Sequence, residues 1–97
     1  MQLWKLDHVT LTDKANLWQS NCKWKFYENG TLGTYIENIS KDKVLGIAND
    51  GKVNEDSPKQ LWERGVADSQ GYFYLKNSES TFLTAMSADT LAIKGAH

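Results

Sequence analysis

The stretch that decides the fold runs from Gln60 to Ala85 and has the sequence QLWERGVADSQGYFYLKNSESTFLTA. It begins with the tripeptide Gln60-Leu61-Trp62, which is followed by a polar turn. Residues 71–77 then form an aromatic-rich segment, and residues 82–85 form a second apolar segment. Short apolar segments separated by polar turns are typical of β-strands rather than helices.

Most of this order occurs twice in the chain. Trp24 precedes Trp62 by about 38 residues, a period that indicates a repeat architecture. The matching segments are Tyr35-Ile36-Glu37-Asn38 with Tyr74-Leu75-Lys76-Asn77, Val44-Leu45-Gly46-Ile47 with Phe82-Leu83-Thr84-Ala85, and Asp50-Gly51-Lys52-Val53 with Ala88-Asp89-Thr90-Leu91. We therefore expect one domain over residues 1–97, with repeat units at 24–61 and 62–97 and a partial or degenerate unit at 1–23.

The remaining segments also alternate with a period of two. We expect strands near residues 3–6, 9–12, 24–26, 33–38, 43–47, 52–54, 60–64, 72–77, 81–86 and 90–94. The dipeptide Asn29-Gly30 predicts a hairpin, because both residue types accept positive φ. No segment forms a convincing amphipathic helix. The pattern predicts an all-β fold, and a unit of about 40 residues with four short strands favours closure around a symmetry axis.

The repeat resembles that of β-trefoil proteins, above all ricin-B-type lectin domains. Gln60-Leu61-Trp62 fits their Gln-x-Trp element, and the resemblance covers residues 24–95. It implies a six-stranded barrel capped by three hairpins, with the repeat tryptophans in the core. The residues that we expect in the structural core of such a fold are Trp24, Trp62, Gln60, Tyr35, Tyr74, Leu45 and Leu83.

Two departures from the family pattern stand out. A trefoil needs three repeats, so either the chain is part of a longer trefoil, or residues 1–23 supply a degenerate unit, or two chains complete one barrel as a homo-oligomer. In addition, Gly46 and Thr84 occupy the positions where ricin-type repeats carry the sugar-binding Asp. The hairpin after Gly46 is also short, so the first repeat cannot build the usual sugar site.

The resemblance still implies a carbohydrate-binding module as the first hypothesis. The ligand-binding candidates are Trp18, Asp50, Asp89, Asn38 and Asn77. The two Asp side chains would accept from sugar hydroxyls, and Trp18 would stack on a sugar face. Each has a simpler alternative, since Asn at a strand end and Asp in a turn commonly bond their own backbone. The second hypothesis is a protein-interaction trefoil without sugar binding, as in fascins.

Composition argues against several other classes of function. The chain has 11 basic and 12 acidic residues with no like-charge run, so nucleic acid is not an expected partner. It contains no apolar run of membrane-spanning length. His8 and His97 are isolated, and no catalytic, phosphate-loop or metal-ligand motif occurs. We therefore expect no enzyme activity, no cofactor and no bound metal.

Two sequence features leave location and redox state open. The single cysteine, Cys22, excludes an internal disulfide. Asn29 and Asn38 each begin a glycosylation acceptor pattern, which requires a secretory route. The polar start of the chain does not fit a signal peptide, which would mean a cytoplasmic protein if the chain is complete.

Overall fold

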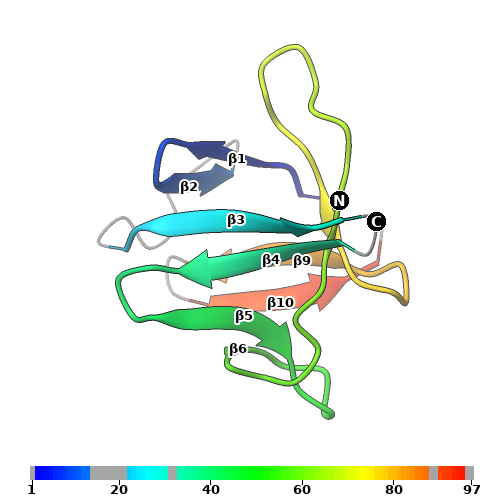
Figure 1. The fold of residues 1–97 in the computed structure, drawn as a ribbon. Helices are drawn as coiled ribbons and strands as arrows, with labels where there is room; N and C mark the ends of the chain where they lie inside the picture. Colours follow the sequence, from blue (N-terminus) through cyan, green and yellow to red (C-terminus); the bar gives the residue numbers. More distant parts are fainter. Residues whose placement is uncertain (1, 14–21, 31–32, 88–89, 96–97) are drawn as a thin grey trace.

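A computed structural model describes residues 2–13, 22–30, 33–87 and 90–95, which contain ten strands and no helix (Figure 1). The predicted all-β class is therefore confirmed. The strands are β1 Trp4–Asp7, β2 Thr10–Asp13, β3 Trp24–Asn29, β4 Gly33–Asn38, β5 Lys43–Ile47, β6 Val53–Glu55, β7 Glu63–Arg64, β8 Leu75–Lys76, β9 Phe82–Ser87 and β10 Thr90–Lys94. Period-two alternation marks the longer strands such as β4, and polar or Gly-bearing turns separate several of them.

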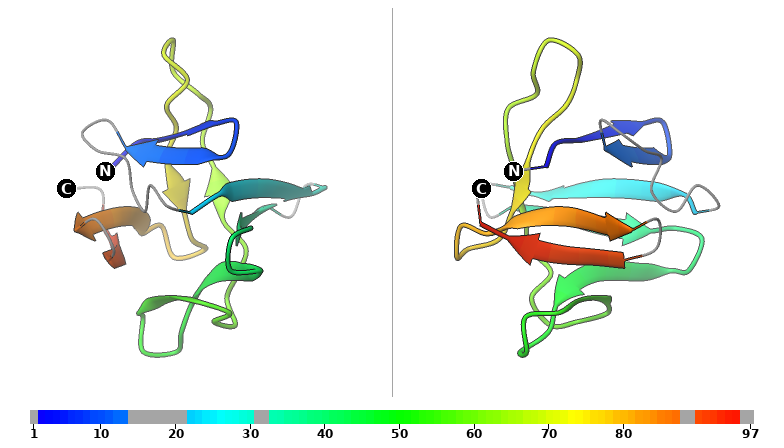
Figure 2. Two further views of the ribbon diagram at one scale, coloured as in Figure 1. Left: turned by 90° about the vertical axis from the view of Figure 1, so that its left-hand side faces the viewer. Right: turned by 180° about the vertical axis from the view of Figure 1, so that it is seen from behind.

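The strands form one hairpin and two four-stranded antiparallel sheets. The hairpin is β1–β2, and the sheets have the orders β3-β4-β5-β6 and β10-β9-β8-β7 (Figure 2). Each sheet uses four consecutive strands from one of the two repeat units recognised in the sequence. The hairpin between β3 and β4 contains the Asn-Gly dipeptide, and Gly30 has a φ of 54°, which suits a residue without a side chain. For brevity we call residues 2–23 unit 1, 24–61 unit 2 and 62–95 unit 3.

Backbone hydrogen bonds join the three units in a ring. The amide of Trp62 donates to the carbonyl of Thr34 in β4 over 2.9 Å, and Thr34 returns the bond to Trp62 over 2.7 Å. The amide of Trp24 donates to the carbonyl of Val9, immediately before β2, over 2.8 Å. In both cases the tryptophan that begins one unit bonds to a residue in, or immediately before, the second strand of the unit before it.

The same contact links the two ends of the described chain. The amide of Trp4 donates to the carbonyl of Phe73 over 2.7 Å, and Phe73 donates to the carbonyl of Trp4 over 2.8 Å. Phe73 stands in unit 3 where Thr34 stands in unit 2, one residue before the matched tyrosine. The ring of backbone contacts therefore runs from unit 1 to unit 2 to unit 3 and returns to unit 1 within a single chain.

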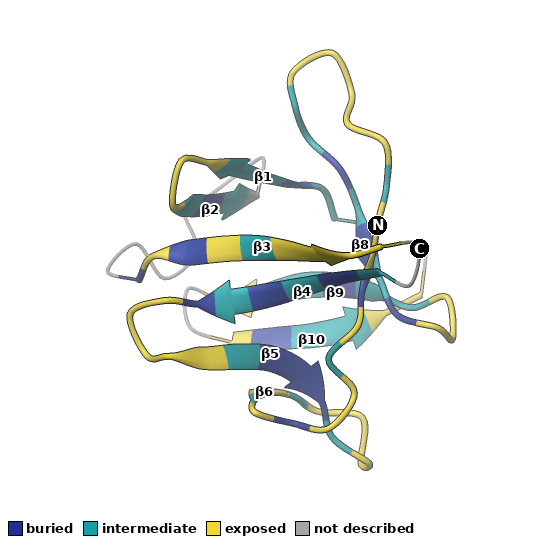
Figure 3. Cartoon of the chain, in the orientation of Figure 1, coloured by how far each residue is buried: buried dark blue, intermediate teal, exposed yellow. Residues whose placement is uncertain are grey.

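Equivalent positions of the three units supply much of the core, and Figure 3 shows which parts of the strands are buried. Trp4, Trp24 and Trp62 are each at most 1% exposed. A second set, at the equivalent position in the second strand of each unit, is equally buried: Leu11, Ile36 and Leu75. Burying three indoles and three branched aliphatic side chains provides the large apolar area that a domain without disulfides needs.

Trp62 and Trp4 make equivalent indole hydrogen bonds to the units that precede them. Trp62 Nε1 donates to the carbonyl of Leu45 in β5 over 3.2 Å, and Trp4 Nε1 donates to the carbonyl of Leu83 in β9 over 3.0 Å. Leu45 and Leu83 are matched positions of the sequence repeat, and both are buried. Each indole thus fixes the start of one unit against the third strand of the preceding unit.

The core position of Trp4 was not predicted from the sequence. The signal was present, because residues 2–4 and residues 60–62 share the tripeptide Gln-Leu-Trp. A search limited to a period near 38 overlooks it, since unit 1 is much shorter than the other two.

Three residues expected to have core roles lie instead at the edge of the core. Tyr35, Tyr74 and Gln60 are all partly exposed. In β4 the burial alternates, so that Thr34 and Ile36 point inward and Tyr35 points to the opposite face. The period of two, rather than aromatic character, decides which side chain enters the core.

Candidate functional site

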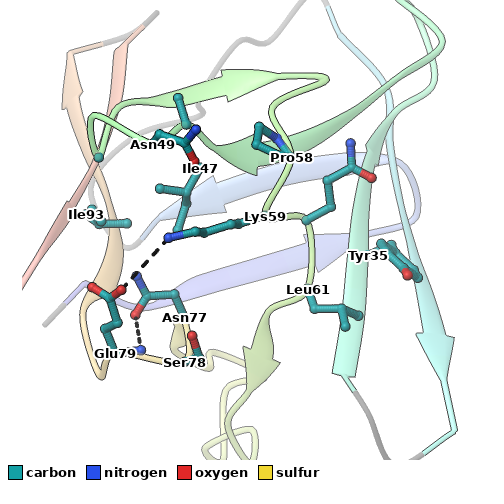
Figure 4. Close-up of a pocket in the computed structure, with 13 residues that line it drawn as sticks. Tyr35, Ile47, Asn49, Pro58, Lys59, Leu61, Asn77, Ser78, Glu79 and Ile93 are labelled. Atoms are coloured by element: carbon teal, nitrogen blue, oxygen red, sulfur yellow. Dashed lines mark hydrogen bonds and ion pairs between the residues drawn. The ribbon is translucent and has the colours of Figure 1, made fainter.

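A cavity of about 470 Å³ lies between unit 2 and unit 3 (Figure 4). Its volume is within the range of about 300–1,000 Å³ that is usual for small-molecule sites. The apolar part of the wall consists of Tyr35, Ile47, Pro58, Leu61 and Ile93. The polar part includes Asn49, Lys59, Gln60, Asn77, Ser78 and Glu79. The cavity therefore offers one apolar surface and several hydrogen-bonding groups.

Backbone pairing holds the unit 2 side of the cavity. The amide of Ile47 donates to the carbonyl of Lys59 over 2.9 Å, and Lys59 donates back over 3.3 Å. The next turn, residues 48–52, is closed by the amide of Gly51 donating to Ala48 and by the amide of Ala48 donating to Lys52. These bonds fix the segment after β5 beside the segment that leads to Trp62.

Asn77 forms the unit 3 side and has a fixed orientation. Its Oδ1 accepts from the backbone amides of Glu79 and Thr81, each over 3.0 Å. Only the oxygen of the side-chain amide can accept, so the nitrogen must point the other way. Figure 4 shows that this nitrogen faces the space between Lys59 and Glu79. Asn77 as a whole is only 8% exposed, and its Nδ2 is a donor that faces the cavity.

One ion pair lies across the cavity. Lys59 Nζ and Glu79 Oε1 are 4.0 Å apart, and their side chains are 59% and 72% exposed. A long pair between such exposed groups contributes little to stability. Both charged groups are therefore available to a ligand at small cost.

A separate polar cluster lies outside the cavity, on β7 and β8. The hydroxyl of Tyr74 donates to Glu63 Oε2 over 3.0 Å, and Lys76 Nζ lies 3.4 Å from the same oxygen. The hydrogen bond to Glu63 is the main reason that the pKa of Tyr74 is raised above its usual 10.0, and burial and the charge of Glu63 act in the same direction. Lys76 opposes this shift.

The structure brings together only part of the predicted ligand set. Asn77 lines the cavity, and Asp50 lies in the adjoining turn, where it is exposed and its Oδ1 accepts from the amide of Lys52 over 3.0 Å. Asn38 is buried away from the cavity and donates to Glu55. Trp18 and Asp89 lie outside the described residues.

The sequence analysis missed several residues of the wall. Tyr35 was expected in the core, and strand alternation is the signal that would have placed it on the outer face. Lys59 lies in the extended segment that pairs with Ile47, and Glu79 lies in the turn after β8. Neither belongs to a distinguishing motif, so nothing in the sequence singles them out. They meet only because the units pack side by side.

Comparisons with known proteins give no relative, since a scan of protein-family models, a search of curated proteins and a search of solved structures each find no match. In the part of the chain that the structure describes, no helix is long and apolar enough to cross a membrane. Over the same residues, no three His, Cys, Asp or Glu side chains gather as a metal-ion site would require.

Proposed function

We propose that the protein is a non-catalytic binding module with a β-trefoil architecture, and that it binds carbohydrate in the cavity between units 2 and 3. The trefoil proposal is supported by the ring of contacts that begins at Trp4, Trp24 and Trp62. Three units that pair in the same way around one core are what a pseudo-threefold fold requires. Closure within one chain also favours a monomer over a barrel shared between chains.

The observation that carries the binding proposal is the mixed wall of the cavity. Sugars present apolar C–H faces and a rim of hydroxyl groups, so their sites combine an apolar or aromatic surface with fixed donors and acceptors. Tyr35 and Leu61 offer the apolar surface, while Asn77, Lys59 and Glu79 offer hydrogen-bonding groups. Asn77 is also one of the ligand-binding candidates named from the sequence, beside its simpler role in a turn.

The wall composition favours binding over catalysis. Its described residues include no histidine and no cysteine, and Glu79 is the single carboxylate among them. General acid–base chemistry on a sugar usually uses two carboxyl groups that flank the reacting bond. A single, well-solvated carboxylate suits the role of a hydrogen-bond acceptor.

Calorimetric titration with a panel of simple sugars tests this proposal. We expect saturable binding of at least one sugar, and we expect Tyr35→Ala to weaken it about tenfold because the ring surface is lost. Tyr74→Ala is the matched control, because Tyr74 is the repeat equivalent of Tyr35 and does not line the cavity. Absence of binding to every sugar by a folded protein would refute the proposal.

A protein-interaction module is the second candidate, and one loop favours it. The segment between β7 and β8 projects from the molecule (Figure 1), and Val66 within it is 97% exposed. The loop is held in shape by Asp68, whose Oδ1 accepts from the amides of Gln70 and Tyr72. If this loop is the binding element, Val66→Ser should abolish association with a protein partner, and free sugars should not compete.

A further inference from the structure

The equivalent asparagines of units 2 and 3, Asn38 and Asn77, have different hydrogen-bond partners. In unit 2, Asn38 is fully buried and its Nδ2 donates to Glu55 Oε1 over 3.4 Å. Lys41 Nζ also lies 3.4 Å from that oxygen. In unit 2 the carboxylate of Glu55 therefore interacts with the side-chain amide of Asn38 and the ammonium group of Lys41.

Unit 3 has an apolar residue where unit 2 has this carboxylate. Strand register pairs Leu45 with Glu55, and it pairs the matched Leu83 with Ile93. Ile93 is therefore the equivalent of Glu55, and it lines the cavity. The change from Glu to Ile removes the acceptor that would otherwise satisfy the asparagine of this unit.

The donor of unit 3 remains in place without that acceptor. Asn77 is the repeat equivalent of Asn38, and its Oδ1 is fully engaged by the turn that follows β8. Among the described residues, none accepts a hydrogen bond from its Nδ2. A donor that faces the cavity without a protein acceptor is open to an acceptor from a ligand, and hydrogen bonds to charged groups are the stronger ones. The ammonium group of Lys59 reaches the same space (Figure 4).

From this difference we infer that the cavity binds an acidic sugar, whose carboxylate takes the place that Glu55 fills in unit 2. This inference rests on the proposed function, and it specifies the class of carbohydrate. The ligand carboxylate accepts from Asn77 Nδ2 and pairs with Lys59 Nζ, while the sugar ring lies toward Tyr35 and Leu61. In the free protein Glu79 is the one side chain among the described residues that pairs with the ammonium group of Lys59, and the ligand carboxylate replaces it there.

Titration calorimetry with methyl glycosides tests the inference. The probes are methyl glucuronide and methyl galacturonide, each compared with its neutral counterpart, methyl glucoside or methyl galactoside. We expect at least one uronide to bind about tenfold more tightly than its neutral counterpart, because hydrogen bonds to charged groups are the stronger ones. The preference should fall at high salt.

Three variants and one matched control test which residues bind the carboxylate. Asn77→Asp keeps an oxygen for the turn and replaces the donor with a negative charge, so it should abolish the preference for the uronide. Ile93→Glu copies unit 2 by adding an internal carboxylate, so it should block the uronide, whereas the matched Ile93→Leu should not. Glu79→Gln removes a competing carboxylate and should tighten uronide binding several-fold. Thermal unfolding monitored by circular dichroism verifies that each variant folds, and if Asn77→Asp does not fold, the Ile93 pair decides.

The outcomes separate this inference from the proposed function. Equal binding of uronides and neutral glycosides would overturn the inference and leave the carbohydrate proposal standing. Binding of neither class would overturn both. A uronide preference that survives both Asn77→Asp and Ile93→Glu would also overturn the inference, since the carboxylate would then bind elsewhere.

Discussion

The packing of Trp4 gives the sharpest prediction about the fold, because this residue joins the first unit to the last. Its side chain is fully buried, its backbone pairs with Phe73, and its Nε1 donates to the carbonyl of Leu83. Replacing a buried Trp by Ala costs about 3–5 kcal/mol. Since small domains have about 5–15 kcal/mol of total stability, Trp4→Ala should remove a large part of it.

A milder variant separates packing from hydrogen bonding. Trp4→Phe keeps much of the apolar volume but leaves the carbonyl of Leu83 without its indole donor, which should cost about 1–3 kcal/mol. Trp62→Phe should cost a similar amount, because Trp62 Nε1 makes the equivalent bond to Leu45. Agreement between the two Phe variants would show that unit 1 carries as much of the core as unit 3.

Urea unfolding followed by far-ultraviolet circular dichroism measures these losses through the midpoint and the slope. If Trp4→Ala lowers the free energy of unfolding by less than about 1 kcal/mol, Trp4 is not a core residue. So small a loss is usual for surface positions and not for a buried indole. A large loss for Trp62→Phe together with none for Trp4→Phe would also count against the ring, because it would leave unit 1 outside the core.

Three further predictions concern other parts of the fold. Gly46→Ala should destabilise the protein by about 1–3 kcal/mol, because a Cβ there would lie 2.3 Å from the carbonyl oxygen of Ser57. Gly95→Ala should be neutral, because a Cβ there meets no atom within 4 Å. Equal midpoints of the two variants in urea would refute this. Asn38→Ala should cost about 1–3 kcal/mol by removing the bonds to Glu55 and to the turn that follows β4, and an unchanged melting temperature would contradict this. The pKa of Tyr74 is raised in the folded state above the usual 10.0, so its contribution to stability is complete below about pH 10 and is lost as the pH rises through the folded value. As the pH rises above about 10 the wild type should therefore lose more stability than Tyr74→Phe, and parallel pH profiles would refute the assignment.

The sequence predicted the strands well because two local signals agree along most of the chain. Period-two alternation marks the strand at residues 33–38, and the Asn29-Gly30 turn marks the hairpin that precedes it. The strands of each four-stranded sheet fall within one expected repeat unit, β3 to β6 in residues 24–61 and β7 to β10 in residues 62–97. These features depend on residues that are close in sequence, or on a comparison of the chain with itself.

The cavity could not be predicted in the same way, because it depends on contacts between units. Lys59 and Glu79 are 20 positions apart in sequence, Lys59 in the segment that pairs with Ile47 and Glu79 in the turn after β8, and both segments have ordinary composition. Asn77 was predicted as a ligand candidate, but its simpler role in the turn is also present, since its oxygen bonds the backbone while its nitrogen faces the cavity. One side chain can serve both roles, and sequence alone does not separate them.

Residue substitutions between equivalent positions carry more functional information than the repeat itself. The replacement of Glu55 by Ile93 at matched register becomes meaningful only when the partner of Asn38 is known. From sequence, Ile93 resembles an ordinary strand residue. In the structure it stands where unit 2 has the Glu55 carboxylate, and its side chain lines the cavity.

The measurement that tests the binding proposal most directly is a ¹H–¹⁵N NMR titration of the full chain with the neutral and acidic methyl glycosides, following the side-chain amide of Asn77. The account predicts a saturable shift of this amide and of the backbone amide of Lys59. The side-chain amide of Asn38, which already has its acceptor in Glu55, should stay unchanged as an internal control. Shifts confined to the loop around Val66, or no shift with any glycoside, would contradict the account.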